Sequence, residues 1–97
     1  MNKEQPEKRR GQRIHTSLTV ILKNAQGITR DVSAGGVYFW IPNFLGAPGE
    51  LIDFQVELKR PIGRMMLKCQ GDVMRTEPRA AEVGVAVKIL DSAMTVG

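Results

Sequence analysis

The feature that most constrains the fold is the strict alternation of apolar and polar side chains along residues 50–59, ELIDFQVELK. Ile52, Phe54, Val56 and Leu58 alternate with charged or amide side chains. Successive side chains of a strand point to opposite faces of a sheet, so a period of two predicts a strand with one buried and one solvated face. A helix needs apolar residues every three or four positions, and no long segment of the chain has that spacing.

Five further segments are predicted to be strands, because they alternate in the same way or are short apolar runs. They are residues 15–24, 27–32, 36–41, 66–75 and 82–90. In residues 36–41, Tyr38 and Trp40 are expected on the face opposite to the core. The inward-facing residues of the five segments are expected to be Leu18, Val20, Leu22, Ile28, Val32, Val37, Phe39, Ile41, Leu67, Cys69, Gly71, Val73, Val83, Val85, Val87 and Ile89.

Segments typical of turns separate these strands and complete an all-β pattern. They fall at residues 24–27, 33–36, 42–49, 60–64 and 77–81, where Gly, Pro, Asn or Ala replace the alternation. Six closely spaced strands indicate an antiparallel barrel or sandwich. The tail, DSAMTVG, is expected to form a short C-terminal helical turn with Asp91 or Ser92 as its N-cap.

The positive charge of the chain is concentrated at its N-terminus. Residues 1–13 carry five basic and two acidic side chains, a net charge of +3, whereas the whole chain has a net charge of +4. We therefore expect a flexible basic arm over residues 1–13 and one barrel domain over residues 14–97. A basic arm binds nucleic acid, phosphorylated ligands or acidic lipids, or it serves only as a solubilising tail.

The residue types that most enzymes need are scarce. The chain has one histidine, His15, expected at the surface or in packing, and one cysteine, Cys69, expected in the core. No disulfide framework, cysteine metal cage or nucleophile–histidine pair follows from them, so we expect no enzyme, metal or cofactor. No apolar run approaches the roughly 18 residues of a membrane span, and residues 1–10 lack the apolar part of a secretory signal, which favours a cytoplasmic protein.

The arm contains a first candidate binding element, RRGQR at residues 9–13. Arg9, Arg10 and Arg13 carry fixed charges whose planar forks bind phosphate oxygens or the O6 and N7 atoms of guanine. Gly11 lets the chain bend between them. A solvated run of charges has the same composition, so this element alone does not identify a ligand.

The second candidate element is Asp31-x-Ser33-x-x-Gly36, at a predicted strand end and turn. An ionised Asp31 carboxylate only accepts hydrogen bonds, which suits the paired N1 and N2 donors of a guanine edge. The Ser33 hydroxyl donates or accepts, and Gly36 leaves clearance for a ligand. Gly35 is expected to serve only the turn. A plain Asp-Ser-Gly turn would have the same residues.

These two elements and the strand pattern together resemble the PilZ domain, a bacterial receptor module for cyclic di-GMP. The family's motifs are Arg-x-x-x-Arg before the first strand and Asp/Asn-x-Ser-x-x-Gly at a strand end, and both occur here in that order. The resemblance covers roughly residues 8–90, including GVAVKI at residues 84–89. It implies a six-stranded antiparallel β-barrel and a non-catalytic cyclic di-GMP receptor.

The resemblance also implies roles for individual residues. The arginines of the arm would hold phosphates and guanine faces, Asp31 would accept the guanine N1 and N2 protons, and Ser33 would bind base or phosphate. Arg75 is a further candidate contact from the barrel wall, although no motif includes it. The expected ligand-binding residues are Arg9, Arg10, Arg13, Asp31, Ser33, Gly36 and Arg75.

The expected mechanism is that ligand orders the arm against residues 31–36 and so creates a surface for a downstream protein partner. Two alternatives stay open: a protein-interaction adaptor that keeps the barrel but binds no nucleotide, and a nucleic-acid-binding β-barrel that uses the arm. The sequence leaves open whether one cyclic di-GMP or a stacked pair binds. It also leaves open the oligomeric state and the identity of the partner.

Overall fold

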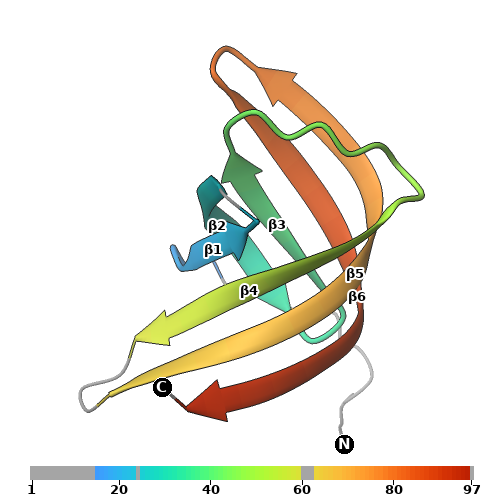
Figure 1. The fold of residues 1–97 in the computed structure, drawn as a ribbon. Coiled ribbons are helices and arrows are strands. Elements are labelled where there is room, and N and C mark those ends of the chain that lie inside the picture. Colours follow the sequence, from blue (N-terminus) through green and yellow to red (C-terminus); the bar gives the residue numbers. More distant parts are fainter. Residues whose placement is uncertain (1–14, 24, 60–62, 97) are drawn as a thin grey trace, which may run out of the picture.

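The structure is a computed structural model that describes residues 15–23, 25–59 and 63–96. These residues form six antiparallel strands in a closed barrel of order β1-β2-β3-β6-β5-β4 (Figure 1). The described residues contain no helix. The predicted six-stranded antiparallel barrel is therefore confirmed, whereas the predicted arm over residues 1–13 lies outside the described residues. The strands are β1 (Thr19–Leu22), β2 (Ala25–Ser33), β3 (Gly36–Ile41), β4 (Leu51–Lys59), β5 (Arg64–Arg79) and β6 (Glu82–Val96).

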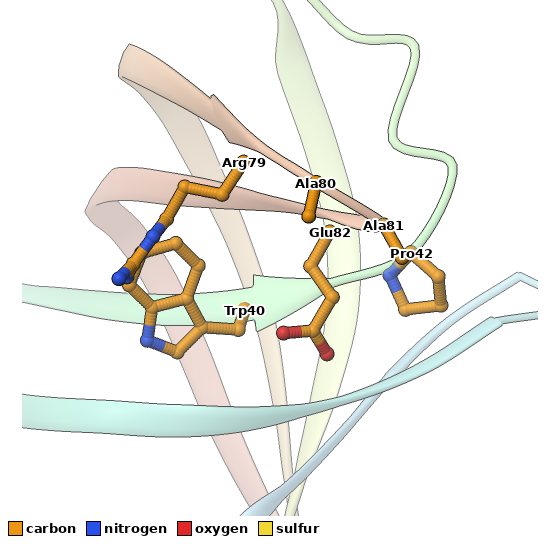
Figure 2. A pocket seen from close by; sticks show the side chains of 6 residues that line it. All are labelled: Trp40, Pro42, Arg79, Ala80, Ala81 and Glu82. Carbon is orange, nitrogen blue, oxygen red and sulfur yellow. The ribbon is translucent and has the colours of Figure 1, made fainter.

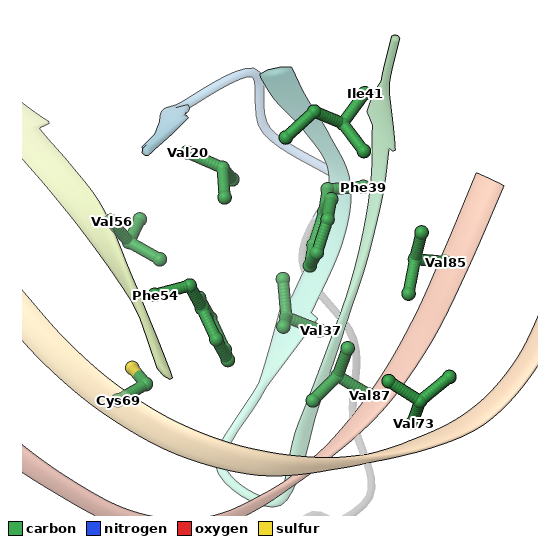
Figure 3. Close-up of a cluster of buried hydrophobic side chains, with 10 residues drawn as sticks. All are labelled: Val20, Val37, Phe39, Ile41, Phe54, Val56, Cys69, Val73, Val85 and Val87. Atoms are coloured by element: carbon green, nitrogen blue, oxygen red, sulfur yellow. The ribbon is translucent and has the colours of Figure 1, made fainter. Parts of the chain in front are cut away.

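The barrel core consists of the inward-facing residues that the alternation predicts. Phe39 and Phe54 come from β3 and β4, and their ring centroids lie 5.7 Å apart across the interior. Figure 3 shows ten buried side chains pointing into the space that the strands enclose. Burial of this apolar area contributes roughly 25 cal/mol per Å² to the stability of the barrel. The buried cluster is Val20, Val37, Phe39, Ile41, Phe54, Val56, Cys69, Val73, Val85 and Val87.

A β-bulge at Arg30 corrects the expectation that Ile28 faces inward. Ile28 is 55% exposed, whereas its neighbour Thr29 is buried and lies opposite Phe39. The register of β2 against β3 shifts between Thr29 and Asp31, so that Arg30 is the extra residue. One extra residue reverses the alternation. A strict period of two therefore could not place both Ile28 and Val32 correctly, and only Val32 packs against the core.

Thr29 is a buried polar residue that connects the segment before β1 to the barrel. Its Oγ1 accepts a hydrogen bond from the Leu18 N–H at 2.8 Å and donates one to the Thr16 carbonyl at 2.5 Å. Its own N–H donates to the Leu18 carbonyl at 2.9 Å. Because buried polar groups without partners are costly, these bonds make burial of the hydroxyl acceptable and fix residues 16–18 on the barrel.

The predicted C-terminal helical turn is wrong, because residues 91–96 continue β6. They pair with Met65–Gln70 of β5, so that Val96 lies opposite Met65 and Met94 lies opposite Leu67. A weak local preference for an N-cap at Asp91 or Ser92 does not compete with a complete ladder of backbone hydrogen bonds. The strand β5 is long enough to pair with both β4 and β6 along its first half.

Candidate functional site

The candidate site lies on the outer face of β2 and β3, where the second predicted motif is found. The bulge at Arg30 is responsible for this position: Thr29 faces the core, whereas Asp31 lies opposite Tyr38 on the outer face. Ser33, two residues further along β2, lies on the same face and opposite Gly36. The structure thus brings Asp31, Ser33 and Gly36 together on one surface. Arg9, Arg10 and Arg13 lie outside the described residues.

Asp31 is deeply buried although it belongs to the outer face, with an exposed fraction of 1%. The Nε of the neighbouring Arg30 lies 2.7 Å from its Oδ2. This hydrogen bond and the negative charge of Asp31 raise the pKa of Arg30 above its ordinary value. When ionised, the Asp31 carboxylate only accepts hydrogen bonds, as it does here from Arg30.

The turn between β2 and β3 presents Ser33 beside a position without a side chain. The Ser33 Oγ donates to the Gly36 carbonyl at 3.3 Å, which holds the hydroxyl over the turn. A Cβ at Gly35 would meet no atom within 4 Å, so a larger residue would also fit at this position. The hydroxyl of Ser33 can exchange this long bond for a shorter one to a ligand.

Tyr38 connects the motif to the expected residue Arg75. Asp31, Tyr38, Ala86 and Arg75 form one row of cross-strand neighbours over β2, β3, β6 and β5. The Arg30 guanidinium carbon lies 3.9 Å from the centroid of the Tyr38 ring, and that of Arg75 lies 5.8 Å away. Arg75 therefore lies on the same face as Asp31, beside the aromatic ring rather than beside the carboxylate.

Glu77 completes this cluster and holds both Tyr38 and Arg75. The Tyr38 hydroxyl donates to Glu77 Oε1, and the Nε of Arg75 donates to Glu77 Oε2 at 3.0 Å. These two hydrogen bonds lower the pKa of Glu77. Burial is the main cause that raises the pKa of Tyr38, and the hydrogen bond to Glu77 raises it further. The result is a fixed arrangement of aromatic ring, carboxylate and guanidinium next to Asp31.

A shallow pocket adjoins the cluster on the side of Trp40 and the β5–β6 turn. The rings of Tyr38 and Trp40 meet edge to face with centroids 5.4 Å apart. Figure 2 shows Arg79 stacked on Trp40, and the guanidinium carbon lies 4.5 Å from the ring centroid. The pocket of about 620 Å³ presents one aromatic plane, one cation and one carboxylate. Its lining is Trp40, Pro42, Arg79, Ala80, Ala81 and Glu82.

The sequence analysis missed Lys88, which lies beside the turn. Ser33, Gly36, Lys88 and Asp72 form a second row across β2, β3, β6 and β5, adjacent to the row of Asp31. Lys88 is exposed and makes no ion pair within the residues that the structure describes. A lysine in an alternating strand has no distinguishing signal, so only the cross-strand register identifies its position.

Two further features, a metal-binding cluster and a membrane-spanning helix, are not found among the described residues. Within residues 15–23, 25–59 and 63–96, no group of three or more His, Cys, Asp or Glu side chains is placed to hold a metal ion. In the same ranges, no helix has the length and apolar character needed to cross a membrane.

Comparisons with known proteins agree with the barrel fold. A family model described as the PilZ domain matches residues 7–95. Among solved structures, the chain is similar to the Bacillus subtilis inhibitor of motility MotI/DgrA, with a TM-score of 0.70 and 17% sequence identity. The similarity covers 84% of this chain and 41% of that protein, and at this identity it shows the fold alone. A search of curated protein sequences finds no match.

Proposed function

The chain belongs to the PilZ family, and from this premise we propose that it is a non-catalytic receptor for cyclic di-GMP. The observation that carries the proposal is the common face of Asp31, Ser33 and Gly36, which the bulge at Arg30 turns to the outside of the barrel. The family match includes the arm residues 7–13, so it extends over the Arg-x-x-x-Arg element.

In the proposed complex, each residue of this face has a chemical role. The Asp31 carboxylate accepts the N1 and N2 protons of one guanine, and Ser33 bonds to base or phosphate. Gly36 leaves room for the ligand above the turn. Arg9, Arg10 and Arg13 supply the planar cationic forks that bind phosphate oxygens and stack on guanine.

The barrel wall adds two cationic side chains beside the same ligand. Lys88 lies opposite Gly36 and offers a positive charge to a phosphate that occupies the clearance there. The Tyr38 cluster places Arg75 one row away, where it can contact the far side of the nucleotide. Because Glu77 holds Arg75, this side chain loses less conformational entropy on binding than an unrestrained one.

We propose that ligand binding changes the surface that the protein presents to other proteins. Closure of the arginine arm over the phosphates covers the Asp31 face and presents the arm to a downstream protein partner. The energy of this step comes from charge-assisted hydrogen bonds between arm and ligand. A second messenger acts inside the cell, so the proposed receptor works in the cytoplasm.

Isothermal titration calorimetry with cyclic di-GMP tests the proposal. Each charge-assisted hydrogen bond contributes roughly 1.5–3 kcal/mol, and about 1.4 kcal/mol changes affinity tenfold. Asp31→Asn and Arg13→Ala are therefore each expected to weaken binding by about one to two orders of magnitude. The matched control is Asp53→Asn, which alters an exposed carboxylate of β4 and is expected to bind as wild type.

The same titration separates the proposal from the other possibilities. Its stoichiometry distinguishes one cyclic di-GMP from a stacked pair. No detectable heat at high ligand concentration would reject the receptor function and leave an adaptor that binds no nucleotide. Equal affinity for cyclic di-GMP and for long single-stranded DNA, with a steep salt dependence, would instead indicate a nucleic-acid-binding barrel.

A further inference from the structure

Within the described residues, the C-terminal half of β6 has one edge without a neighbouring strand. On one side, β6 pairs with β3 from Val83 to Lys88, and the contact ends where the Ile89 N–H donates to the Gly35 carbonyl at 3.0 Å. Beyond that point, within the residues that the structure describes, residues 91–96 pair only with β5, and Leu90 is the extra residue of a bulge. Figure 1 shows this part of β6, in dark red, at the margin of the sheet. Its outer row of N–H and C=O groups can therefore accept another strand.

Residues 92–96 lack two of the features that usually prevent strands from associating, and the bulge at Leu90 and the charge of Asp91 lie just before them. Proteins protect exposed edges with proline, inward-pointing charges or covering loops. Residues 92–96 contain no proline and no charged residue. Met94 and Val96 of β6 lie opposite the apolar residues Leu67 and Met65 of β5. Both side chains are uncovered, since Met94 is 49% exposed and Val96 is 78% exposed. Both the backbone edge and the apolar face beside it are thus suited to an added strand.

We propose that this edge pairs with the same segment of a second copy of the chain, antiparallel and centred on Ala93, to form a two-fold dimer. A two-fold interface must be complementary to itself, and this segment meets that condition. Pairing about Ala93 uses the regular part of the strand, residues 91–95. Val96 then lies level with Leu90, the extra residue of a bulge in β6, so that exposed apolar residues meet at both ends of the ladder.

The charge pattern favours this register. Asp91 is the only charged residue of the segment, and pairing about Ala93 places it opposite the neutral Thr95 of the second copy. Pairing about Asp91 would place two carboxylates directly opposite each other, which destabilises a sheet. The dimer would join β4, β5 and β6 of both copies into one continuous sheet, and it does not depend on nucleotide binding.

Disulfide trapping tests the register. In the proposed dimer, residue 93 lies opposite itself, and directly opposite Cα atoms are about 4.5–5.5 Å apart, within disulfide range. Ala93→Cys is therefore expected to give a covalent dimer on mild oxidation. The matched control is Thr95→Cys, whose two copies would be offset by four residues, or about 13 Å, and is expected to stay monomeric. Both variants keep the buried Cys69.

Sedimentation velocity of the wild-type protein tests the association itself. The wild type is expected to be a concentration-dependent dimer, and Met94→Lys is expected to be a folded monomer by circular dichroism, because it places charges beside the two-fold axis. A wild type that stays monomeric up to ~1 mM, the weak end of specific association, would overturn the proposal. Faster cross-linking of Thr95→Cys than of Ala93→Cys would overturn it as well.

Discussion

Thr29 and Asp31 lie two positions apart in β2 but face opposite sides of the barrel wall, because Arg30 is an extra residue between them. In a regular strand, residues two apart share a face. The bulge lets one short strand supply a buried hydroxyl to the core and a carboxylate to the outer surface. Bulges are common beside functional sites, where they redirect a side chain.

Deletion of Arg30 is expected to leave the candidate site in place, because Thr29 and Asp31 pair with the consecutive residues Phe39 and Tyr38. Without the extra residue, Asp31 and Ser33 stay opposite Tyr38 and Gly36 in a regular ladder, and Val32 stays on the core face. The deletion removes the ion pair with Asp31 and the stacking on Tyr38, and it is expected to cost about 1 kcal/mol, the upper end for a partly exposed pair. Urea unfolding followed by circular dichroism measures this loss, and calorimetry measures whether cyclic di-GMP binding is retained.

Arg30→Ala is the matched control, because it removes the ion pair and the stacking on Tyr38 but keeps the number of residues. We expect this variant to retain the fold and to lose about as much stability as the deletion. A much larger loss in the deletion would show that β2 does not close into a regular ladder and would contradict the assignment of Arg30 as the extra residue.

Gly84→Ala tests how Tyr38 and Trp40 are positioned. A Cβ at Gly84 would collide with the Tyr38 hydroxyl, and it would lie 2.8 Å from the Tyr38 Cζ and from the Trp40 Cζ3. We expect a loss of about 1–3 kcal/mol, and a Tm lower by about 4–8 °C for each kcal/mol. A shift in the emission of Trp40, the only tryptophan, reports displacement of the rings. Gly35→Ala is the control, since a Cβ there meets nothing within 4 Å, and an equal loss in both variants would refute the crowding.

The sequence pattern predicts the core well where strands are regular. Val37, Phe39 and Ile41 are buried as expected, because a period of two is sufficient to identify the inner face of β3. The pattern fails at Ile28, where one bulged residue reverses the alternation, and at residues 91–96, where pairing with β5 outweighs a local helical preference. Both failures arise from contacts with distant strands, which a local pattern does not contain.

In the candidate site, too, local patterns predict neighbours within one hairpin but not neighbours on distant strands. The motif correctly suggests that Asp31, Ser33 and Gly36 come together, because they lie within one hairpin. Lys88 and Tyr38 could not be identified in this way, since their neighbours across the sheet depend on the order of strands in the barrel. The roles of Arg9, Arg10, Arg13 and Arg75 in ligand binding stay predictions.

Lys88→Met is expected to weaken cyclic di-GMP binding by about tenfold, the equivalent of about 1.4 kcal/mol. Lys88 lies opposite Gly36, so its loss removes one positive charge beside the proposed phosphate position. The dependence of affinity on salt should also become less steep, because one fewer charge pair is screened. Lys68→Met is the matched control, since Lys68 is an exposed lysine of β5 that lies opposite Ala93, outside both rows of the site. Calorimetry at two salt concentrations measures both effects, and identical changes in the two variants would argue against a specific role for Lys88.

Cys69 gives the barrel a pH-dependent component of stability at alkaline pH. Burial raises the pKa of its thiol from the ordinary 9.0 to about 11. Between these values the unfolded chain releases the proton while the folded barrel retains it, so ionisation favours unfolding. The contribution of the neutral thiol is therefore fully present below pH 9 and is lost as the pH rises towards 11.

Urea unfolding of wild type and Cys69→Ala from pH 7 to pH 11 measures this effect. Below pH 9, the variant is expected to be less stable by a constant amount, because a small cavity replaces a sulfur atom that packs in the core. Above pH 9, the wild type should lose stability faster than the variant, by up to ~1.4 kcal/mol for each pH unit. The other titrating groups are common to both proteins, so the difference between the two curves isolates the thiol. Curves that stay parallel across the whole range would show that Cys69 titrates normally and is reached by water in the folded barrel.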